Sequence, residues 1–235
     1  MLITAHRGLS SVAPENTLIA IQKAIELGAK SVEIDVQISR DGVPVVIHDF
    51  TVNRCTNGRG LVQDIDYQDL ARLDAGLWFS DEYENEHIPT LAAVLALIKK
   101  HGIALNIELK IQNEIHILAL CEQVIAVIEA SKVTTGQLVF SSFQHQALLL
   151  LKRLKPSIRR SQLWEKIPDN ALKMLEDIYA FSVNCDYRFL KKEQAIKIKQ
   201  AGYQIHCYTI NDPALIEPLR PLHVDNIITD WPQRF

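Results

Sequence analysis

The sequence predicts an α/β fold, specifically a (β/α)₈ barrel. Short apolar strands alternate with amphipathic helices along the chain, a pattern that favours parallel strands joined by crossover helices. Eight such units fit in the 235 residues, and a (β/α)₈ barrel usually has about 250. No glycine-rich phosphate loop follows a strand, which weighs against the doubly wound open sheet, the alternative for this pattern. We therefore expect a single barrel domain over residues 1–235.

Each barrel strand is predicted from a short apolar run. Such runs occupy residues 2–5, 31–38, 104–110, 137–142, 179–184, 203–209 and 224–229, and a weaker strand–helix pair occupies 159–176. The other helices are predicted at residues 17–27, 91–100, 113–131, 144–154, 190–201 and 213–220. Gly28 and Gly202 directly follow a helix, where glycine commonly ends one. Only five residues follow Asp230, so we expect the last helix to be truncated or missing.

Residues 43–89 interrupt this alternation. A further apolar strand is predicted at residues 43–48, after the turn Arg40-Asp41-Gly42. Residues 50–89 have no clear helix or strand periodicity and contain several turn signals, among them Asn57-Gly58. We therefore predict a small insertion after the second barrel strand, roughly over residues 43–89.

Composition and charge exclude several classes of protein. The chain is 48% hydrophobic and 23% charged, as in ordinary globular proteins, and its net charge of −3 comes without a long basic run. Nothing therefore indicates a nucleic-acid partner or stable membrane insertion. The first residues lack a secretory signal pattern, and the four cysteines lie far apart without metal-site spacing. We expect a soluble, cytoplasmic protein with reduced thiols, whose oligomeric state stays open.

Polar side chains gather where the predicted strands end. Glu33 and Asp35 share one face of the strand 31–38, because side chains alternate along a strand. Active sites of (β/α)₈ barrels lie at the carboxyl ends of the strands. Several other polar residues fall at such ends, namely His6-Arg7, His48-Asp49, Glu108, Lys110 and Thr229-Asp230. We expect this polar face to point inward and the groups to converge on one rim.

The residue types on this rim indicate a metal-assisted reaction on an anion. Glu33, Asp35 and Glu108 offer carboxylate oxygens, which suit a hard divalent cation such as Mg²⁺ or Ca²⁺. Without a cation the three carboxylates would repel and raise one another's pKa. Arg7 and Lys110 add positive charge beside them, and a phosphate fits both a guanidinium fork and an ammonium point charge.

His6 and His48 are candidates for proton transfer. An ordinary histidine pKa of ~6.5 allows one neutral and one protonated copy to act as base and acid at neutral pH. Five further histidines are expected to be ordinary hydrogen-bonding residues: His87, His101, His116, His145 and His223.

Several motifs resemble one enzyme family in the same order. They are "AHRGLSSVAPENT", "EIDVQISRDGVPVVIHD" and "IELK"; "TNGRG", "LDAG" and "IPTL" lie between the second and third of these, and "TDWP" lies at residues 229–232. Together they strongly resemble the glycerophosphodiester phosphodiesterases. The resemblance implies a (β/α)₈ barrel with a small insertion after strand 2. It also implies hydrolysis of deacylated phospholipids, such as glycerophosphocholine or glycerophosphoethanolamine, to sn-glycerol 3-phosphate and an alcohol.

The resemblance also implies roles for individual residues. The divalent-cation ligands would be Glu33, Asp35 and Glu108. The catalytic histidines would be His6 and His48, with His6 as base and His48 as acid by similarity to the phosphoinositide-specific phospholipases C. Arg7 and Lys110 would hold the phosphate. Whether the nucleophile is water or the substrate's own glycerol hydroxyl stays open.

One segment departs from the family pattern. The family often has tryptophan before the Thr-x-Asn of strand 7, whereas this chain has Tyr208 in "CYTIN". Tyr208 keeps a flat apolar wall for the substrate and adds a hydroxyl, which either alters the head-group preference or is a packing variant. Phe143 is a second candidate for that wall. Trp78 and Phe79 either cap the site or, as we prefer, anchor the insertion.

Three alternatives have different sequence requirements. A lysophospholipase D or sphingomyelinase D type of enzyme acts on acylated lipids and needs an exposed apolar rim or anchoring helix, which is not evident. A catalytically silent binding module is expected to have lost one of the two histidines or three carboxylates. All five are present: His6, Glu33, Asp35, His48 and Glu108. An unrelated barrel, such as an enolase-type or sugar-phosphate enzyme, would not require the pair His6 and His48.

Overall fold

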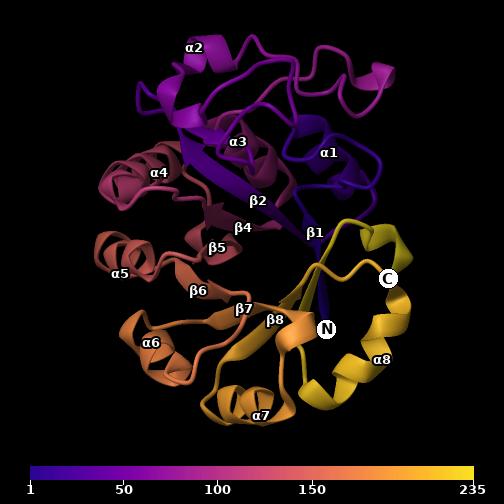
Figure 1. Cartoon of the computed structure of the whole chain (residues 1–235), viewed down its shortest axis with the longest axis vertical. Helices are drawn as coiled ribbons and strands as arrows, with labels where there is room; N and C mark the ends of the chain where they lie inside the picture. Colours follow the sequence, from indigo (N-terminus) through magenta and orange to yellow (C-terminus); the bar gives the residue numbers. More distant parts are fainter.

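Eight parallel strands close into a barrel in the computed structural model, which describes residues 1–235. Around the barrel the strands are hydrogen-bonded in the order β1–β2–β4–β5–β6–β7–β8–β9, and β9 pairs with β1 to close it (Figure 1). They are β1 (Leu2–His6), β2 (Ser31–Ile38), β4 (Ala104–Leu109), β5 (Leu138–Ser142), β6 (Arg159–Trp164), β7 (Ser182–Asp186), β8 (Gln204–Tyr208) and β9 (Asn226–Thr229). The predicted (β/α)₈ barrel is confirmed.

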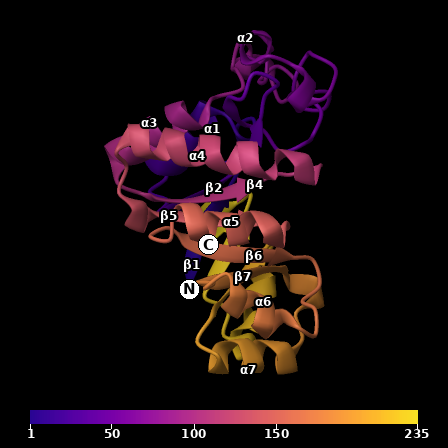
Figure 2. The same ribbon diagram turned by 90° about the vertical axis from the view of Figure 1, so that its left-hand side faces the viewer.

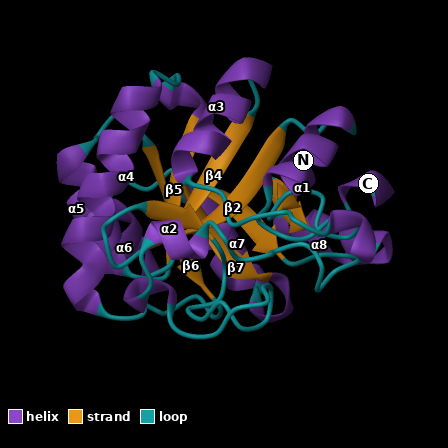
Figure 3. Cartoon of the chain, turned by 90° about the horizontal axis from the view of Figure 1, so that it is seen from above, coloured by secondary structure: helices purple, strands orange, loops and turns teal.

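Helices cover the outside of this barrel (Figure 3). They are α1 (Leu18–Glu26), α3 (Leu91–His101), α4 (Ile117–Ser131), α5 (His145–Leu154), α6 (Ala171–Asp177), α7 (Lys192–Gln200) and α8 (Ile216–Leu219). Thr17 and Thr90 cap α1 and α3, since each side chain accepts a hydrogen bond from a backbone N–H of the first turn. After β9 the structure has one 3₁₀ turn, Pro232–Arg234.

The hydrophobic core lies between the barrel and its helices. One cluster of 32 buried residues joins the first four barrel strands to α1, α3, α4 and α5, and a cluster of 14 joins the later strands to the later helices. In β2 the outward side chains Val32, Ile34 and Val36 belong to the larger cluster. Glu33 and Asp35 therefore point into the barrel, and both are buried. The prediction that the polar face of this strand turns inward is confirmed.

Residues between β2 and α3 form an excursion at one end of the molecule (Figure 2). It contains β3 (Pro44–Val46), which pairs antiparallel with β2, then a 3₁₀ turn (Val62–Asp64), α2 (Tyr67–Leu70) and a second 3₁₀ turn (Asp81–Tyr83). Seven buried residues, including Val52 and Leu70, give this segment a small apolar core of its own. The segment stands above the carboxyl end of β2, so the loop that follows β3 lies beside the barrel rim.

The prediction of a strand at residues 179–184 was wrong in its boundaries. β7 begins only at Ser182 and extends to Asp186. Tyr179 takes a left-handed conformation, with φ 49°, and the N–H groups of Tyr179 and Ala180 bond back to α6 carbonyls. These residues therefore close the preceding helix and cannot begin the strand. The shift puts Asn184 in the middle of the strand.

Candidate active site

A pocket of about 180 Å³ lies at the carboxyl ends of the barrel strands. Most residues predicted for the site line it: His6, Arg7, Glu33, His48, Glu108, Lys110, Phe143 and Tyr208. The remaining predicted residue, Asp35, is 1% exposed and lies between Arg7 and Lys110, two of the lining residues. The structure therefore brings together all nine residues that the sequence analysis assigned to the site.

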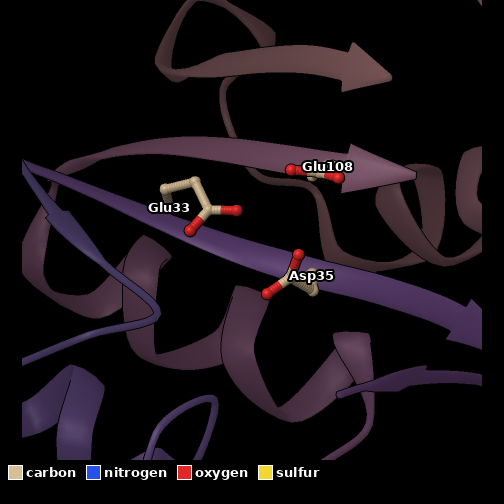
Figure 4. Close-up of side chains that lie close together, drawn as sticks. All are labelled: Glu33, Asp35 and Glu108. Carbon is tan, nitrogen blue, oxygen red and sulfur yellow. The ribbon is translucent and has the colours of Figure 1, made fainter. Parts of the chain in front are cut away.

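Three carboxylates converge on one side of the pocket. Glu33 and Asp35 come from β2, and Glu108 comes from β4, where it pairs in register with Asp35. One oxygen of each lies within 4.8 Å of the others (Figure 4). Figure 4 shows the three carboxylate groups turned toward the same small space between the strands. Three oxygen donors at this spacing can surround one divalent cation.

The electrostatics of this cluster favour a bound cation. Burial, and repulsion by Asp35 and Glu108, raise the pKa of Glu33 well above its ordinary value. Burial would also raise the pKa of Asp35, but the positive charges of Arg7 and Lys110 outweigh it and hold that pKa below its ordinary value. Glu33 Oε1 is buried and has no hydrogen-bond partner in the protein. A buried carboxylate oxygen without a donor fits a metal ligand.

The turn after β1 orients the carboxylates. The Arg7 backbone N–H donates to Glu33 Oε2 at 3.1 Å. Asn16 holds Asp35 twice, since its Nδ2 donates to Asp35 Oδ2 at 2.9 Å and its Oδ1 accepts from the Asp35 N–H at 3.1 Å. Asn16 takes a left-handed conformation, with φ 60°, which asparagine tolerates better than most residues. In the sequence Asn16 stands only within the motif "APENT", and nothing there predicts its contact with Asp35.

Both histidines are held through the same ring nitrogen. His6 Nδ1 lies 2.6 Å from Asp230 Oδ1, and His48 Nδ1 lies 2.7 Å from Asp49 Oδ1. A carboxylate on Nδ1 favours a proton there and leaves Nε2 free to accept or donate in the pocket. His6 Nε2 is 3.9 Å from Glu33 Oε2, and His48 Nε2 is 3.3 Å from Lys110 Nζ. The two Nε2 atoms therefore face the carboxylate cluster and the cationic side chain beside it.

Asp230 is itself tightly held. It accepts hydrogen bonds from Ser10 Oγ at 3.0 Å and from Asn211 Nδ2 at 2.7 Å, in addition to its contact with His6. Asp230 was predicted only as a polar residue at a strand end, and its contact with His6 was not predicted. Asn211, the asparagine of "CYTIN", was not singled out.

A chain of ion pairs connects His48 to the turn after β1. Arg54 donates to both oxygens of Asp49, at 2.8 and 2.9 Å, and to both oxygens of Glu15, each at 2.8 Å. Glu15 also accepts from Arg7 Nη1 at 2.7 Å. Sequence reasoning missed Arg54, because a single arginine in an irregular segment carries no pattern. Its contacts fix the insertion against the site.

The two cationic residues predicted for phosphate already contact carboxylates. Lys110 Nζ lies 2.8 Å from Glu108 Oε1 and 3.8 Å from Asp35 Oδ1. Arg7 Nε lies 3.2 Å from Asp35 Oδ2. Both side chains nonetheless line the pocket, so an anion entering it would meet positive charge next to the carboxylate cluster.

Aromatic side chains form part of the pocket wall. Phe143 and Tyr208 meet edge to face, with ring centroids 6.5 Å apart, and Phe143 is 48% exposed. The Tyr208 hydroxyl donates to the backbone oxygen of Trp164 at 3.0 Å, and this contact favours the packing-variant interpretation of Tyr208. Trp78 and Phe79 do not line the pocket; Trp78 Nε1 donates to Ala75 within the insertion, as expected of an anchor.

Comparison with known proteins identifies the family. The sequence model of the glycerophosphoryl diester phosphodiesterase family matches residues 6–234. The chain belongs to this family. It is 34% identical to the glycerophosphodiester phosphodiesterase of Caldanaerobacter subterraneus, with 99% of this chain and 95% of that protein covered. The corresponding enzyme of Bacillus altitudinis is 37% identical, with 99% and 95% covered.

Solved structures of glycerophosphodiester phosphodiesterases share the fold. A phosphodiesterase from Oleispira antarctica, solved in complex with the product sn-glycerol-3-phosphate, superposes with a TM-score of 0.94 and 36% identity over 100% of this chain and 94% of that one. The glycerophosphodiester phosphodiesterase of Agrobacterium tumefaciens superposes with a TM-score of 0.81 and 28% identity over 99% and 97%. The family consists of enzymes that act on glycerophosphodiesters and generally need a divalent cation, a requirement that the carboxylate cluster fits. None of the helices could span a membrane.

Proposed function

We propose that the chain hydrolyses glycerophosphodiesters such as glycerophosphocholine and glycerophosphoethanolamine to sn-glycerol 3-phosphate and an alcohol, with a divalent cation and two histidines. One observation carries the proposal: a cluster of three carboxylates and two carboxylate-anchored histidines share one pocket. This arrangement suits the hydrolysis of a phosphodiester, because that reaction develops negative charge on oxygen and moves two protons.

Glu33, Asp35 and Glu108 would hold the cation, for which Mg²⁺ and Ca²⁺ are the candidates. When bound, the cation would neutralise charge on the phosphate oxygens. Arg7 and Lys110 would orient the phosphate from beside the cluster. Phe143 and Tyr208 would pack against the carbon atoms of the substrate.

His6 and His48 would transfer the protons through Nε2. One takes a proton from the attacking oxygen, and the other gives a proton to the departing alcohol. Asp230 and Asp49 keep the proton on Nδ1 and so hold both rings in the useful tautomer. The assignment of His6 as base and His48 as acid stays a prediction.

The decisive assay is release of sn-glycerol 3-phosphate from glycerophosphocholine by the purified protein. It is run with EDTA, with added Mg²⁺ and with added Ca²⁺. We expect release only with a divalent cation, and replacement of His6 or His48 by alanine should lower kcat about 10²–10⁴-fold without unfolding the protein. A folded variant with near-normal turnover would refute the role of that histidine.

A substrate with a good leaving group separates the two histidine roles. Glycerophospho-p-nitrophenol releases a phenolate that needs no acid, so loss of the general acid should matter far less with it than with glycerophosphocholine. Loss of the general base should reduce both reactions alike. We expect His48→Ala to be rescued and His6→Ala not; the opposite result would exchange the roles.

The second candidate substrate class is acylated lysophospholipids. Exposed apolar side chains do occur near the site, with Phe143 at 48% and Trp78 at 39% exposure. Release of choline from lysophosphatidylcholine at a higher kcat/KM than from glycerophosphocholine would favour this class.

A further inference from the structure

The inside of this barrel is polar well below the active site. Inward side chains near the amino ends of the strands are four small hydroxyls, one amide and one histidine, all buried: Thr4, Ser31, Ser161, Ser182, Asn226 and His206. Barrels of this class usually fill that space with bulky Val, Ile and Leu. Serine and threonine occupy less volume than these residues and leave both room and hydrogen-bonding groups along the barrel axis.

Two cavities lie along this axis and share a wall residue. The active-site pocket is at the carboxyl end of the strands. A second cavity of about 130 Å³, here called the lower cavity, is at the amino end and is lined by Thr4, Ser31, His206 and Asn226 among others. Asn106 lines both cavities. The side chain of Asn106 is therefore a wall that the two cavities share, and Asn106 pairs in register with Glu33 on the neighbouring strand.

A row of hydrogen bonds runs between the same two cavities on the far side of the barrel. His206 Nδ1, in the lower cavity, lies 3.5 Å from Ser182 Oγ, and Ser182 Oγ donates to Ser161 Oγ at 2.8 Å. Ser161 Oγ in turn donates to Asn184 Oδ1, and Asn184 lines the active-site pocket. This contact fixes the amide of Asn184, so its Nδ2 is left as a free donor.

Three buried polar atoms in this region have no protein partner. They are Asn106 Oδ1, Ser141 Oγ and Asn184 Nδ2. Buried polar atoms in proteins are nearly always hydrogen-bonded to protein or to water. The set mixes an acceptor, a donor and a hydroxyl, which water satisfies and which neither an ion nor an apolar ligand would. About 10–15 Å³ of cavity space suffices for one water molecule, so the lower cavity has room for several.

We propose that the barrel axis is a water passage that opens at the amino end of the strands. It delivers the water molecule that attacks phosphorus to the floor of the active-site pocket, the side lined by Asn106 and Asn184. The inference rests on the proposed function. In the final displacement the water oxygen forms a bond to phosphorus as the bond from phosphorus to the departing alkoxide oxygen breaks. The water proton goes to one histidine Nε2, and the alkoxide takes a proton from the other.

The geometry of displacement explains why a floor entrance is useful. Attacking and leaving oxygens lie roughly in line on opposite sides of phosphorus. A diester that enters by the mouth blocks the pocket from above, whereas water rising past Asn106 and Asn184 reaches phosphorus without crossing the substrate. The passage is narrow and lined by small polar side chains, so it should admit water and exclude larger nucleophiles.

The first test is occupancy, which needs no turnover. A high-resolution crystal structure of the metal-free wild-type protein should show ordered waters bonded to Asn106 Oδ1, Ser141 Oγ and Asn184 Nδ2 and continuing into the lower cavity. A dry axis, or re-pairing of these atoms with one another, would overturn the proposal. If waters are present but no sn-glycerol 3-phosphate is released under any condition, the proposed function fails, and the delivery role fails with it.

The second test is the choice of acceptor. With methanol added, water and methanol compete as nucleophiles, and methanol gives methyl glycerophosphate. At early turnover, the methyl ester should make up a share of the wild-type products at least about tenfold smaller than its share in uncatalysed solvolysis. A single added methyl group supports discrimination of that size. Ser182→Leu should lower turnover and raise the methyl ester share, whereas the matched control Ser182→Ala should change neither. If Ser182→Leu does not fold, Ser31→Val narrows the lower cavity instead. A wild-type methyl ester share equal to that of solvolysis would place water entry at the mouth and overturn the proposal.

Discussion

Replacement of Asp230 by asparagine probes how the His6 ring is held. Burial would raise the pKa of Asp230, but its hydrogen bond to His6 and the charge of that ring outweigh burial and lower the pKa to about 2. A fall from the ordinary 3.8 to about 2 corresponds to about 2 kcal/mol of stability at neutral pH. Because the folded-state pKa is lowered, this stability is present above pH ~4 and is lost as the pH falls toward 2. Asp230→Asn should remove it.

The same replacement should also impair turnover. The carboxylate accepts from His6 on one oxygen and from Asn211 on the other, but an asparagine amide has only one acceptor. Either the amide nitrogen opposes the donor of Asn211, or it faces His6 Nδ1 and drives the proton to Nε2, the wrong tautomer for a base. We expect kcat for glycerophosphocholine to fall by about 10²-fold or more, within the range for a disabled acid or base.

Exchange of the side chains at positions 230 and 211 distinguishes the effect of the His6 tautomer from the effect of removing the charge at position 230. In the double variant Asp230→Asn/Asn211→Asp, the new carboxylate accepts from the amide at position 230, whose oxygen is then free to accept from His6 Nδ1. Asn211 also accepts from Thr229 Oγ1 and the Asp230 N–H, and a carboxylate preserves both bonds. The double variant should recover at least about tenfold of the lost kcat, as expected for residues that act through one network. Wild-type turnover in Asp230→Asn, or no recovery in the exchange, would refute this reasoning.

Three further predictions concern the metal, pH and packing. Glu33→Gln keeps size but removes charge and should weaken Mg²⁺ or Ca²⁺ binding by more than about 10-fold in calorimetric titration; unchanged affinity would remove Glu33 from the ligand set. Burial lowers the pKa of His206 to about 4, so the free energy of unfolding of the wild type should fall as the pH drops below 6.5. Between pH 7.5 and 4.5, His206→Gln should lose ~2–3 kcal/mol less of this free energy than the wild type, as measured by urea unfolding. A Cβ on Gly8 would lie 2.6 Å from a backbone carbon of Ala20, so Gly8→Ala should cost ~1–3 kcal/mol more than Gly42→Ala by scanning calorimetry. Gly42 has nearly the same positive φ but open space around it, and equal losses would show that the clash is unimportant.

The sequence predicted the barrel because its signals are local and repeated. Alternating Val and Ile in residues 31–38 define both a strand and its two faces, and the inward position of Glu33 and Asp35 follows from the period of two. The boundary of β7 was missed for the converse reason. Asn184 and Asp186 interrupt the apolar run, while Tyr179 and Ala180 look like strand residues but close the helix before it.

The contacts that orient the site were harder to predict than its central residues. Asp230 contacts His6 across 224 positions of sequence, and no local pattern indicates such a pair. Arg54 lies in an irregular loop, where its four hydrogen bonds to Asp49 and Glu15 depend on the path of the insertion. Residues that bear the chemistry therefore have recognisable spacing, whereas residues that position them depend on tertiary structure.

The pairing of β1 with β9 has a consequence for how this protein is made. His6 leaves the ribosome 224 residues before Asp230, the residue that holds its ring. The strand β1 must wait until β2 to β8 have been synthesised before its neighbour β9 exists. A nascent chain can assemble the carboxylate cluster from β2 and β4 early, but its His6 stays without its carboxylate until β9 and Asp230 have been synthesised. Full activity should therefore appear in a single late step, after the barrel has closed.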